Sequence, residues 1–358
     1  MSRIAETRKV QRFGRSTLMV SLPSEWVKSV GLKPGDLVRI EVREDGTLLI
    51  IPEALLEKRM RGKEVVIHID HTTPEEILVR SIYAMYIAGY DRIVIECDEP
   101  YILSQQLHAI RNIVRMLIGA EIVEQTASKV TIQVFIDVEK YGLENLVLRM
   151  INSLKSMLDF LMLSIKSGKK EHLKELMELE YELDRVHALA VRYTYVLSML
   201  GGTPFLTEYR ALIKDFEDIG DSLTSAAQAF VDQPEILGKI GSALAYQLDE
   251  LKEMLFYAFD IIYDALVKED VYMATKAVDL AIEISKFVSK LEGEILPKFN
   301  TAEEYSRIKT FFDKMQLVCN HLQGAAELSF DIVLGKRREK IDLRKRVKPT
   351  YAPPQASQ

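Results

Sequence analysis

Several residue types are scarce in this chain of 358 residues, and each scarcity narrows the class of protein. Only two cysteines occur, Cys97 and Cys319, and both lie in periodic apolar segments. A disulfide framework is therefore excluded, and the pair is expected to be inert core thiols in a reducing cytosol. No uninterrupted apolar run reaches the length of a membrane span, and the first residues lack the apolar centre of a signal peptide. These absences predict a cytoplasmic protein without a membrane span.

Charged residues are abundant, and the two signs are unevenly distributed along the chain, whose net charge is −6. Residues 1–52 carry nine Lys/Arg and six Asp/Glu, and residues 336–358 carry eight and two. The stretch between them holds 30 basic and 45 acidic residues. Basic ends on an acidic body are typical of a protein that contacts nucleic acid or another polyanion at its ends. A solvated acidic surface with a basic tail would give the same totals.

The length predicts two or three domains, and the hydrophobic pattern places their boundaries. Residues 1–54 contain short strands and tight turns, and residues 55–141 alternate strands with helices, which predicts a small α/β domain. Residues 142–335 are helical throughout, with breaks near 168, 201–204, 233–234, 268–270 and 297. The breaks predict six long helices in two three-helix units, followed by a basic, disordered tail over 336–358. The expected fold class is multidomain and mainly α.

The first segment has a specific order of elements. Strands are expected at 8–12 and 17–22, a helix at 24–30 with Ser24 as N-cap, and hairpin strands at 36–42 and 47–52. The run RKVQRFGRSTLMVSLPSEWVKSVGLKPGDLVRIEVREDGTLLIIP resembles the AbrB/MazE/SpoVT family of swapped-hairpin DNA-binding domains. That resemblance implies half of a β-barrel, completed in a homodimer. It also implies DNA contacts from four basic residues: Arg8, Lys9, Arg12 and Arg15.

The second segment offers no recognisable chemical motif. Strands are expected at 65–70 and 92–97, helices at 74–88 and 102–118, and a closing hairpin over 121–136. Thr72 or Thr73 is expected to cap the first helix. No glycine-rich phosphate loop follows either strand, and the histidines His68, His71 and His108 do not have a ligand spacing. The segment is interpreted as a scaffold or a ligand-sensing module.

Two helices of the third segment each carry a carboxylate pair at four-residue spacing. Glu180 and Asp184 form one pair, and Glu217 and Asp221 form the other. Residues four apart share a helix face, and the two pairs are nearly equidistant from the turn at Leu200-Gly201. An antiparallel hairpin would therefore place both pairs at the same height. Such a cluster repels itself unless protons or a metal ion neutralise it.

The third and sixth helices of this segment align as copies of one repeat. Glu217-Asp218-Ile219-Gly220-Asp221 matches Gln316-Leu317-Val318-Cys319-Asn320, and both runs continue to an Ala-Ala pair. Neutral Gln316 and Asn320 thus stand at the two acid positions, and the phase of Asp279 and Glu283 on the fifth helix is ambiguous. We expect one intact metal site and one degenerate copy, because a hard cation needs charged oxygens.

With these motifs, residues 142–335 resemble PhoU, the phosphate-uptake regulator, and the full domain order resembles archaeal PhoU-type regulators. The resemblance implies a metal site at Glu180, Asp184, Glu217 and Asp221. It also implies phosphate transporter subunits or a histidine kinase as partners. Oxygen ligands favour Mg, Ca, Mn or iron, divalent or trivalent, over zinc. The predicted function is that of a dimeric, non-enzymatic, DNA-binding regulator of phosphate uptake.

Three alternatives remain open from the residues. The acids could pair with Arg185 or Lys214 at the surface. The bundle could serve as a metal-free adaptor for a transporter subunit or kinase, without DNA contact. A ferritin-like di-metal enzyme would need two Glu-x-x-His motifs, and Asp184-x-x-His187 is the only approximation. His187 is therefore expected at a helix surface or interface.

Overall fold

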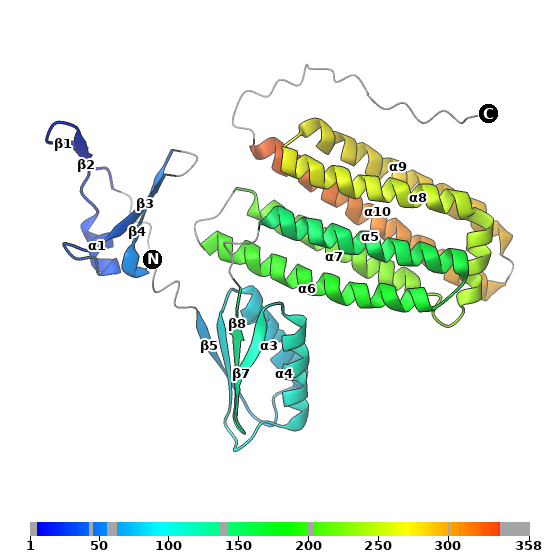
Figure 1. Cartoon of the computed structure of the whole chain (residues 1–358), viewed down its shortest axis with the longest axis horizontal. Helices are drawn as coiled ribbons and strands as arrows, with labels where there is room; N and C mark the ends of the chain where they lie inside the picture. The colour runs from blue at the N-terminus through cyan, green and yellow to red at the C-terminus, as the bar shows by residue number, and fades with distance from the viewer. Residues whose placement is uncertain are drawn as a thin grey trace.

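The computed structural model describes residues 6–42, 46–55, 63–136, 142–199, 204–299 and 301–336. These residues form three successive parts (Figure 1): a pair of hairpins, a small sheet with two helices, and a bundle of long helices. The predicted mainly helical fold class is confirmed. The predicted turn at Leu200-Gly201, most of the hairpin turn near residue 45 and the tail after residue 336 lie outside the described residues.

The N-terminal part consists of two separate antiparallel hairpins with a short helix between them. The elements are β1 (Gln11–Phe13), β2 (Thr17–Met19), α1 (Ser24–Val30), β3 (Val38–Val42) and β4 (Leu48–Pro52). The first two strands are shorter than predicted. The expectation that Ser24 caps the helix was wrong, because Pro23 occupies the N-cap without any side-chain bond. The fixed φ of proline is compatible with the extended conformation of that position.

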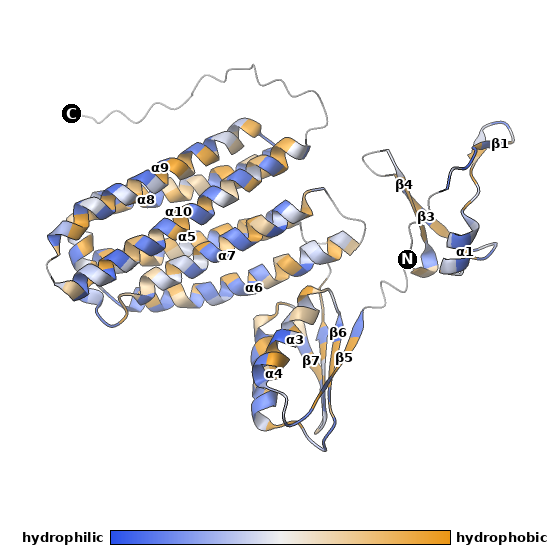
Figure 2. Ribbon diagram, turned by 180° about the vertical axis from the view of Figure 1, so that it is seen from behind, coloured by the Kyte–Doolittle hydropathy of each residue, from blue (hydrophilic) through white to orange (hydrophobic). Residues whose placement is uncertain are grey.

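This part has almost no core of its own. Among its described residues only Ile51 and Pro52 are buried. Large apolar side chains remain in solvent: Val10, Phe13, Leu18, Met19, Val20, Leu37, Ile40, Val42 and Leu48. Figure 2 shows the hydrophobic colour along β3. Exposed apolar surface of this extent is typical of an interaction site.

The second part is a four-stranded sheet with two helices on one face. Its elements are β5 (Glu64–Ile69), α3 (Glu75–Ile87), β6 (Arg92–Cys97), α4 (Ser104–Met116), β7 (Ala120–Gln125) and β8 (Lys129–Val134). The strand order is β5-β6-β8-β7, and only the β5–β6 pair is parallel. Thr72 and Thr73 do not cap α3, because both hydroxyls donate to the carboxylate of Asp70, at 2.7 and 2.9 Å, and Pro74 takes the N-cap.

The third part contains the six long helices that the sequence predicted. They are α5 (Leu143–Ser167), α6 (Glu171–Met199), α7 (Leu206–Gln228), α8 (Pro234–Lys268), α9 (Val271–Ile295) and α10 (Ala302–Lys336). The short 3-10 helix η2 (Leu296–Lys298) follows α9. No helix among the described residues is both long and apolar enough to cross a bilayer.

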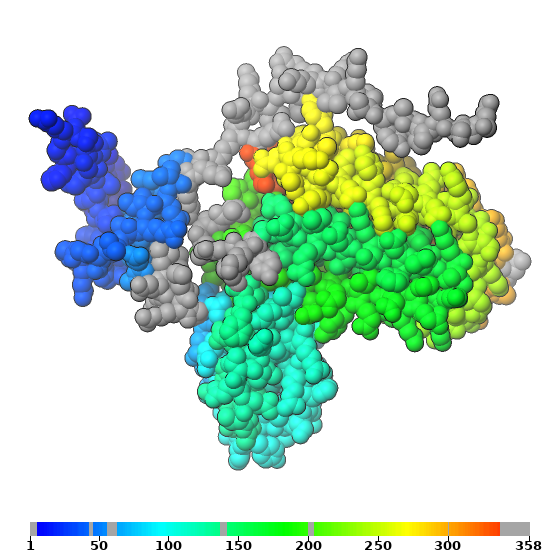
Figure 3. Space-filling model, in the orientation of Figure 1, coloured from blue at the N-terminus to red at the C-terminus, as the bar shows by residue number. Residues whose placement is uncertain are grey.

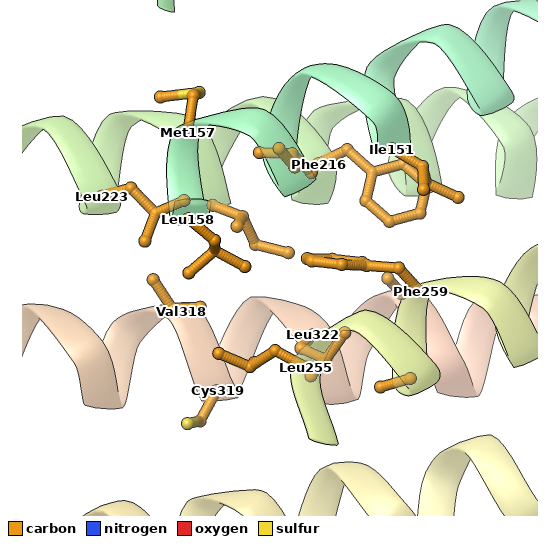
Figure 4. Close-up of a cluster of buried hydrophobic side chains, with 14 of the residues drawn as sticks. Ile151, Met157, Leu158, Phe216, Leu223, Leu255, Phe259, Val318, Cys319 and Leu322 are labelled. Carbon is orange, nitrogen blue, oxygen red and sulfur yellow. The ribbon is translucent and has the colours of Figure 1, made fainter. Parts of the chain in front are cut away.

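One continuous core joins all six helices. Figure 4 shows part of it, where Phe216 of α7 and Phe259 of α8 meet with ring centroids 6.3 Å apart. Leu158 of α5 and Leu322 of α10 are fully buried in the same cluster. Two helix pairs, α7 with α10 and α5 with α8, link the two three-helix units.

The α/β part docks against the bundle through helix α6, and the two are in contact in Figure 3. Arg192 of α6 is 1% exposed and lies at the centre of this junction. Its guanidinium donates to the carbonyls of Tyr86 and Tyr90 at 2.6 and 2.8 Å, and to the Asp91 carboxylate at 2.6 Å. The C-terminal end of α3 is thereby anchored to α6 by a buried cation, which suits the negative end of a helix dipole.

Candidate metal centre

The structure brings three of the four predicted carboxylates together. One oxygen each of Asp184 on α6 and of Glu217 and Asp221 on α7 lie within 4.8 Å of one another. Glu180 lies outside this group, although the charges of Asp221 and Glu217 act on it. The equal height of the two acid pairs, expected from their spacing about the turn, accounts for the convergence. We call all four predicted carboxylates, Glu180, Asp184, Glu217 and Asp221, the acid cluster.

A glycine lets the two helices approach closely beside the acid cluster. A Cβ built at Gly220 would lie 2.2 Å from Leu183 Cδ2. Gly220 precedes Asp221, and Leu183 precedes Asp184, so the closest approach of α6 and α7 lies next to the carboxylates. The absence of a side chain at this position brings the two acidic faces within reach of one ion.

Electrostatic repulsion within the acid cluster appears in its pKa values. Burial, followed by the charges of Glu180, Glu217 and Asp221, raises the pKa of Asp184 to about 7. Burial and the neighbouring carboxylates also raise the pKa of Glu180 and of Asp221. Carboxyl groups so close together cannot all ionise without a compensating cation. The cluster therefore favours binding of protons or a metal ion.

The protein supplies one lysine near the acid cluster. Lys214 bonds to Glu217, and its ammonium donates to Asp218 Oδ1 at 2.6 Å. Although burial opposes it, these hydrogen bonds raise the pKa of Lys214 to about 12. Arg185 instead pairs with Glu182 at 2.8 Å. Of the two cations considered from sequence, only Lys214 pairs with a cluster carboxylate.

Two further side chains border the acid cluster. His187 is 7% exposed, so it belongs to the helix interface and not to the surface. Its Nδ1 lies 3.9 Å from Glu217 Oε1, and burial lowers its pKa to about 4, which keeps the ring neutral. Tyr83 of α3 lies close enough to be affected by the charges of Arg210, Glu217 and Asp184, and burial raises its pKa. No sequence pattern links residue 83 to this cluster, because the link depends on docking of the α/β part.

In the second three-helix unit, neutral amides stand at the positions equivalent to Glu217 and Asp221. The Gln316 side chain bonds to Ser285 of α9 and accepts a hydrogen bond from Ser289 at 3.4 Å. Asn320 is exposed, as are Asp279 and Glu283 on α9. The ambiguous acid pair of α9 therefore points to solvent, and amide–serine contacts replace a carboxylate cluster.

The four basic residues proposed to contact DNA all lie on the exposed first hairpin or just before it. Arg12 is in β1 opposite Leu18, and Arg15 lies in the turn after Gly14, whose φ is +67°. Arg8 and Lys9 precede the strand, and Arg8 pairs with Glu6. Contact of these residues with DNA stays a prediction.

Comparison with known proteins identifies both ends of this arrangement. Residues 11–56 match the family described as antidote-toxin recognition MazE, bacterial antitoxin. Residues 147–230, which include the acid cluster, match the PhoU domain family. No curated protein matches the chain. A crystal structure of PhoU from Pseudomonas aeruginosa is similar at 13% identity and a TM-score of 0.45, covering 54% of this chain and 96% of that one. The chain thus carries a MazE/AbrB-like domain at its N-terminus and a PhoU domain in its C-terminal region.

Proposed function

We propose that the chain is a cytoplasmic regulator of phosphate homeostasis that binds DNA through its N-terminal hairpins and a metal ion through the acid cluster. The observation that carries the proposal is the convergence of Asp184, Glu217 and Asp221 at the α6–α7 contact. The PhoU domain supports the phosphate role, and the MazE-like domain supports DNA binding. We assign the chain no catalytic role.

The residues of the acid cluster fit a hard cation. All four candidate ligands are carboxylates, which Mg, Ca, Mn and iron prefer. The raised pKa of Asp184, about 7, indicates that the cluster lacks sufficient positive charge of its own. A bound metal would supply that charge and hold α6 against α7. The metal test therefore measures the content of Mg, Ca, Mn and iron together.

The metal test compares metal content after purification without chelator. Wild-type protein is expected to retain metal, and the Asp184→Asn/Asp221→Asn double variant is expected to lose it. Glu182→Gln is the matched control, since Glu182 lies on the same helix but pairs with Arg185 in solvent. Equal metal in wild type and the double variant would refute the site.

The DNA test uses the first hairpin. Binding of Lys and Arg to phosphates releases counterions, so affinity should fall steeply with salt. We expect Arg12→Gln/Arg15→Gln to weaken binding to promoter fragments and to reduce the slope of log affinity against log salt by about 2. Arg39→Gln is the control, because Arg39 is on β3 and pairs with Glu41 at 3.0 Å. Absence of binding to any promoter fragment at low salt would overturn this half of the proposal.

A dimer follows from the same part of the chain. The apolar side chains exposed on β1 to β4 require a covering surface, and a second copy supplies an identical one. The swapped-hairpin resemblance supports this arrangement. Sedimentation of the full chain is expected to give a dimer, with two copies of the first hairpin available to DNA.

One observation favours a second candidate, a metal-free adaptor for a transporter subunit or a kinase. Lys214 already neutralises part of the charge of Glu217 and Asp218. In that case the wild-type chain would hold no metal and bind no promoter DNA, and both tests above would be negative. The two candidates are therefore separated by the same experiments.

A further inference from the structure

Helix α7 carries a second acidic face, which meets a histidine from the other three-helix unit. One ligand atom each of Asp215, Asp218 and His321 lies within 4.8 Å of the other two. His321 Nδ1 is 3.2 Å from Asp215 Oδ1 and 3.8 Å from Asp218 Oδ2. On an ideal helix this face is rotated by roughly 100° from that of Glu217 and Asp221. The group thus lies between α7 and α10, on a different face of α7 from the acid cluster, although the charges of Asp218 and His321 still act on Asp221.

We propose that Asp215, Asp218 and His321 form a transition-metal site of zinc type, separate from the acid cluster. Ligands at about 2.0–2.2 Å from a tetrahedral zinc ion lie roughly 3.4 Å apart, close to the two separations at His321 Nδ1. Three protein ligands leave a fourth position for water. The imidazole changes the metal preference, because nitrogen ligands suit zinc, iron, cobalt or nickel better than Mg or Ca.

Outer contacts orient both carboxylates toward the histidine. Lys214 donates to Asp218 Oδ1 at 2.6 Å, which leaves Oδ2 directed at His321. Asp215 Oδ2 occupies the space above Gly324 of α10, where a Cβ would lie only 2.8 Å away. Such outer contacts are what fix ligand orientation in metal sites. The missing side chain at residue 324 thus provides the space that the Asp215 carboxylate occupies.

The repeat symmetry of the bundle does not require this arrangement. In the alignment of α7 with α10, the residues equivalent to Asp215, Asp218 and His321 are Lys314, Leu317 and Ser222. None of these can reproduce the ligand set. If the trio served only to pack one helix of the repeat against its copy, the equivalent positions would be expected to carry similar residues. They carry different ones, which favours a specific role over general packing.

The test isolates the proposed site by using the full chain with Asp184→Asn/Asp221→Asn as background. Zn²⁺ is titrated by calorimetry, and Co²⁺ is followed through the visible absorption of its tetrahedral complexes. We expect one Zn²⁺ per chain and an intense Co²⁺ spectrum. Adding His321→Gln should abolish both signals, whereas His68→Gln, which removes an exposed imidazole elsewhere, should leave them unchanged.

Gly324→Ala provides a variant that keeps all three ligands. The added methyl group should displace the Asp215 carboxylate and weaken Zn²⁺ binding by tenfold or more. Alanine favours helix over glycine, but the added methyl group also crowds a packed contact, so far-UV circular dichroism of the same variant is measured to show that it stays folded. Undiminished Zn²⁺ binding in His321→Gln, or no Zn²⁺ binding in the background variant, would overturn the proposal. Neither result bears on the acid cluster, whose metal is measured separately.

Discussion

The buried Arg192 is expected to be the residue that couples the α/β part to the bundle. Replacing it with methionine keeps the side-chain volume and removes three hydrogen bonds, to Tyr86, Tyr90 and Asp91. The cation also lies 5.1 Å from the centre of the Tyr86 ring. Breaking a fully buried charge pair costs about 3–5 kcal/mol, but the Asp91 side chain is 33% exposed, so the main loss is that of the unpaired carbonyls, about 2–3 kcal/mol. We expect Arg192→Met to destabilise the junction by about 2–3 kcal/mol.

The chain offers a convenient assay for this prediction. Its single tryptophan, Trp26, lies in α1, so Trp fluorescence reports on the N-terminal hairpins, whereas far-UV circular dichroism is dominated by the bundle. In urea, Arg192→Met should lower the midpoint measured by dichroism and leave the Trp26 midpoint unchanged. Arg192→Lys should fall between, because a lysine keeps the charge but cannot make the forked contacts. A dichroism midpoint that corresponds to less than about 1 kcal/mol of destabilisation would refute the reasoning, since it lies well below the cost of the unpaired carbonyls.

Three further predictions concern other parts of the molecule. In the metal-free protein the pKa of Asp184 is raised to about 7, well above the ordinary value of an aspartate, about 3.9. The folded state therefore keeps a proton that the unfolded chain loses, and stability should fall as pH rises between those two values. After discounting for partial exposure the loss is about 1–2 kcal/mol, and thermal melts of Asp184→Asn should lack this slope. The Leu18 side chain on the first hairpin is 69% exposed, and Leu18→Lys should convert the dimer to a monomer in sedimentation. An unchanged dimer would contradict the dimer interface proposed for the hairpins. Gly220→Ala should push Leu183 away, cost about 1–3 kcal/mol in urea unfolding and weaken metal retention, and unaltered values for both would contradict the close-approach argument.

Much of the fold is determined by local signals that the sequence displays directly. Hydrophobic periodicity with glycine and proline breaks gave the six bundle helices, and the strand over 92–97 was predicted to the residue. The caps were predicted less well. Proline occupied the N-cap positions expected for Ser24 and for Thr72 or Thr73. At the second helix the two threonine hydroxyls bond to Asp70 instead, which is a competing local bond.

The candidate site was predictable only where its residues lie on neighbouring helices joined by one turn. The distances of Asp184 and Glu217 from the turn predicted that they lie close together, since a hairpin fixes the relative height of its two helices. The effect of the acid cluster on Tyr83 and the contact of His321 with Asp215 depend on packing between distant segments, which no periodicity reveals. Gly220 and Gly324 also looked like ordinary helix positions until the neighbouring helix was in place.

The near absence of buried side chains among the described residues of 6–55 has a consequence for how the proposed regulator would respond to its own abundance. If two chains must meet before either pair of hairpins acquires a core, formation of the unit proposed to contact DNA is second order in protein concentration. Occupancy of DNA would then rise more steeply than the amount of protein and would be negligible below a threshold. The hairpins would thus make the cellular copy number of the chain an input to regulation, alongside any ion that the helices bind.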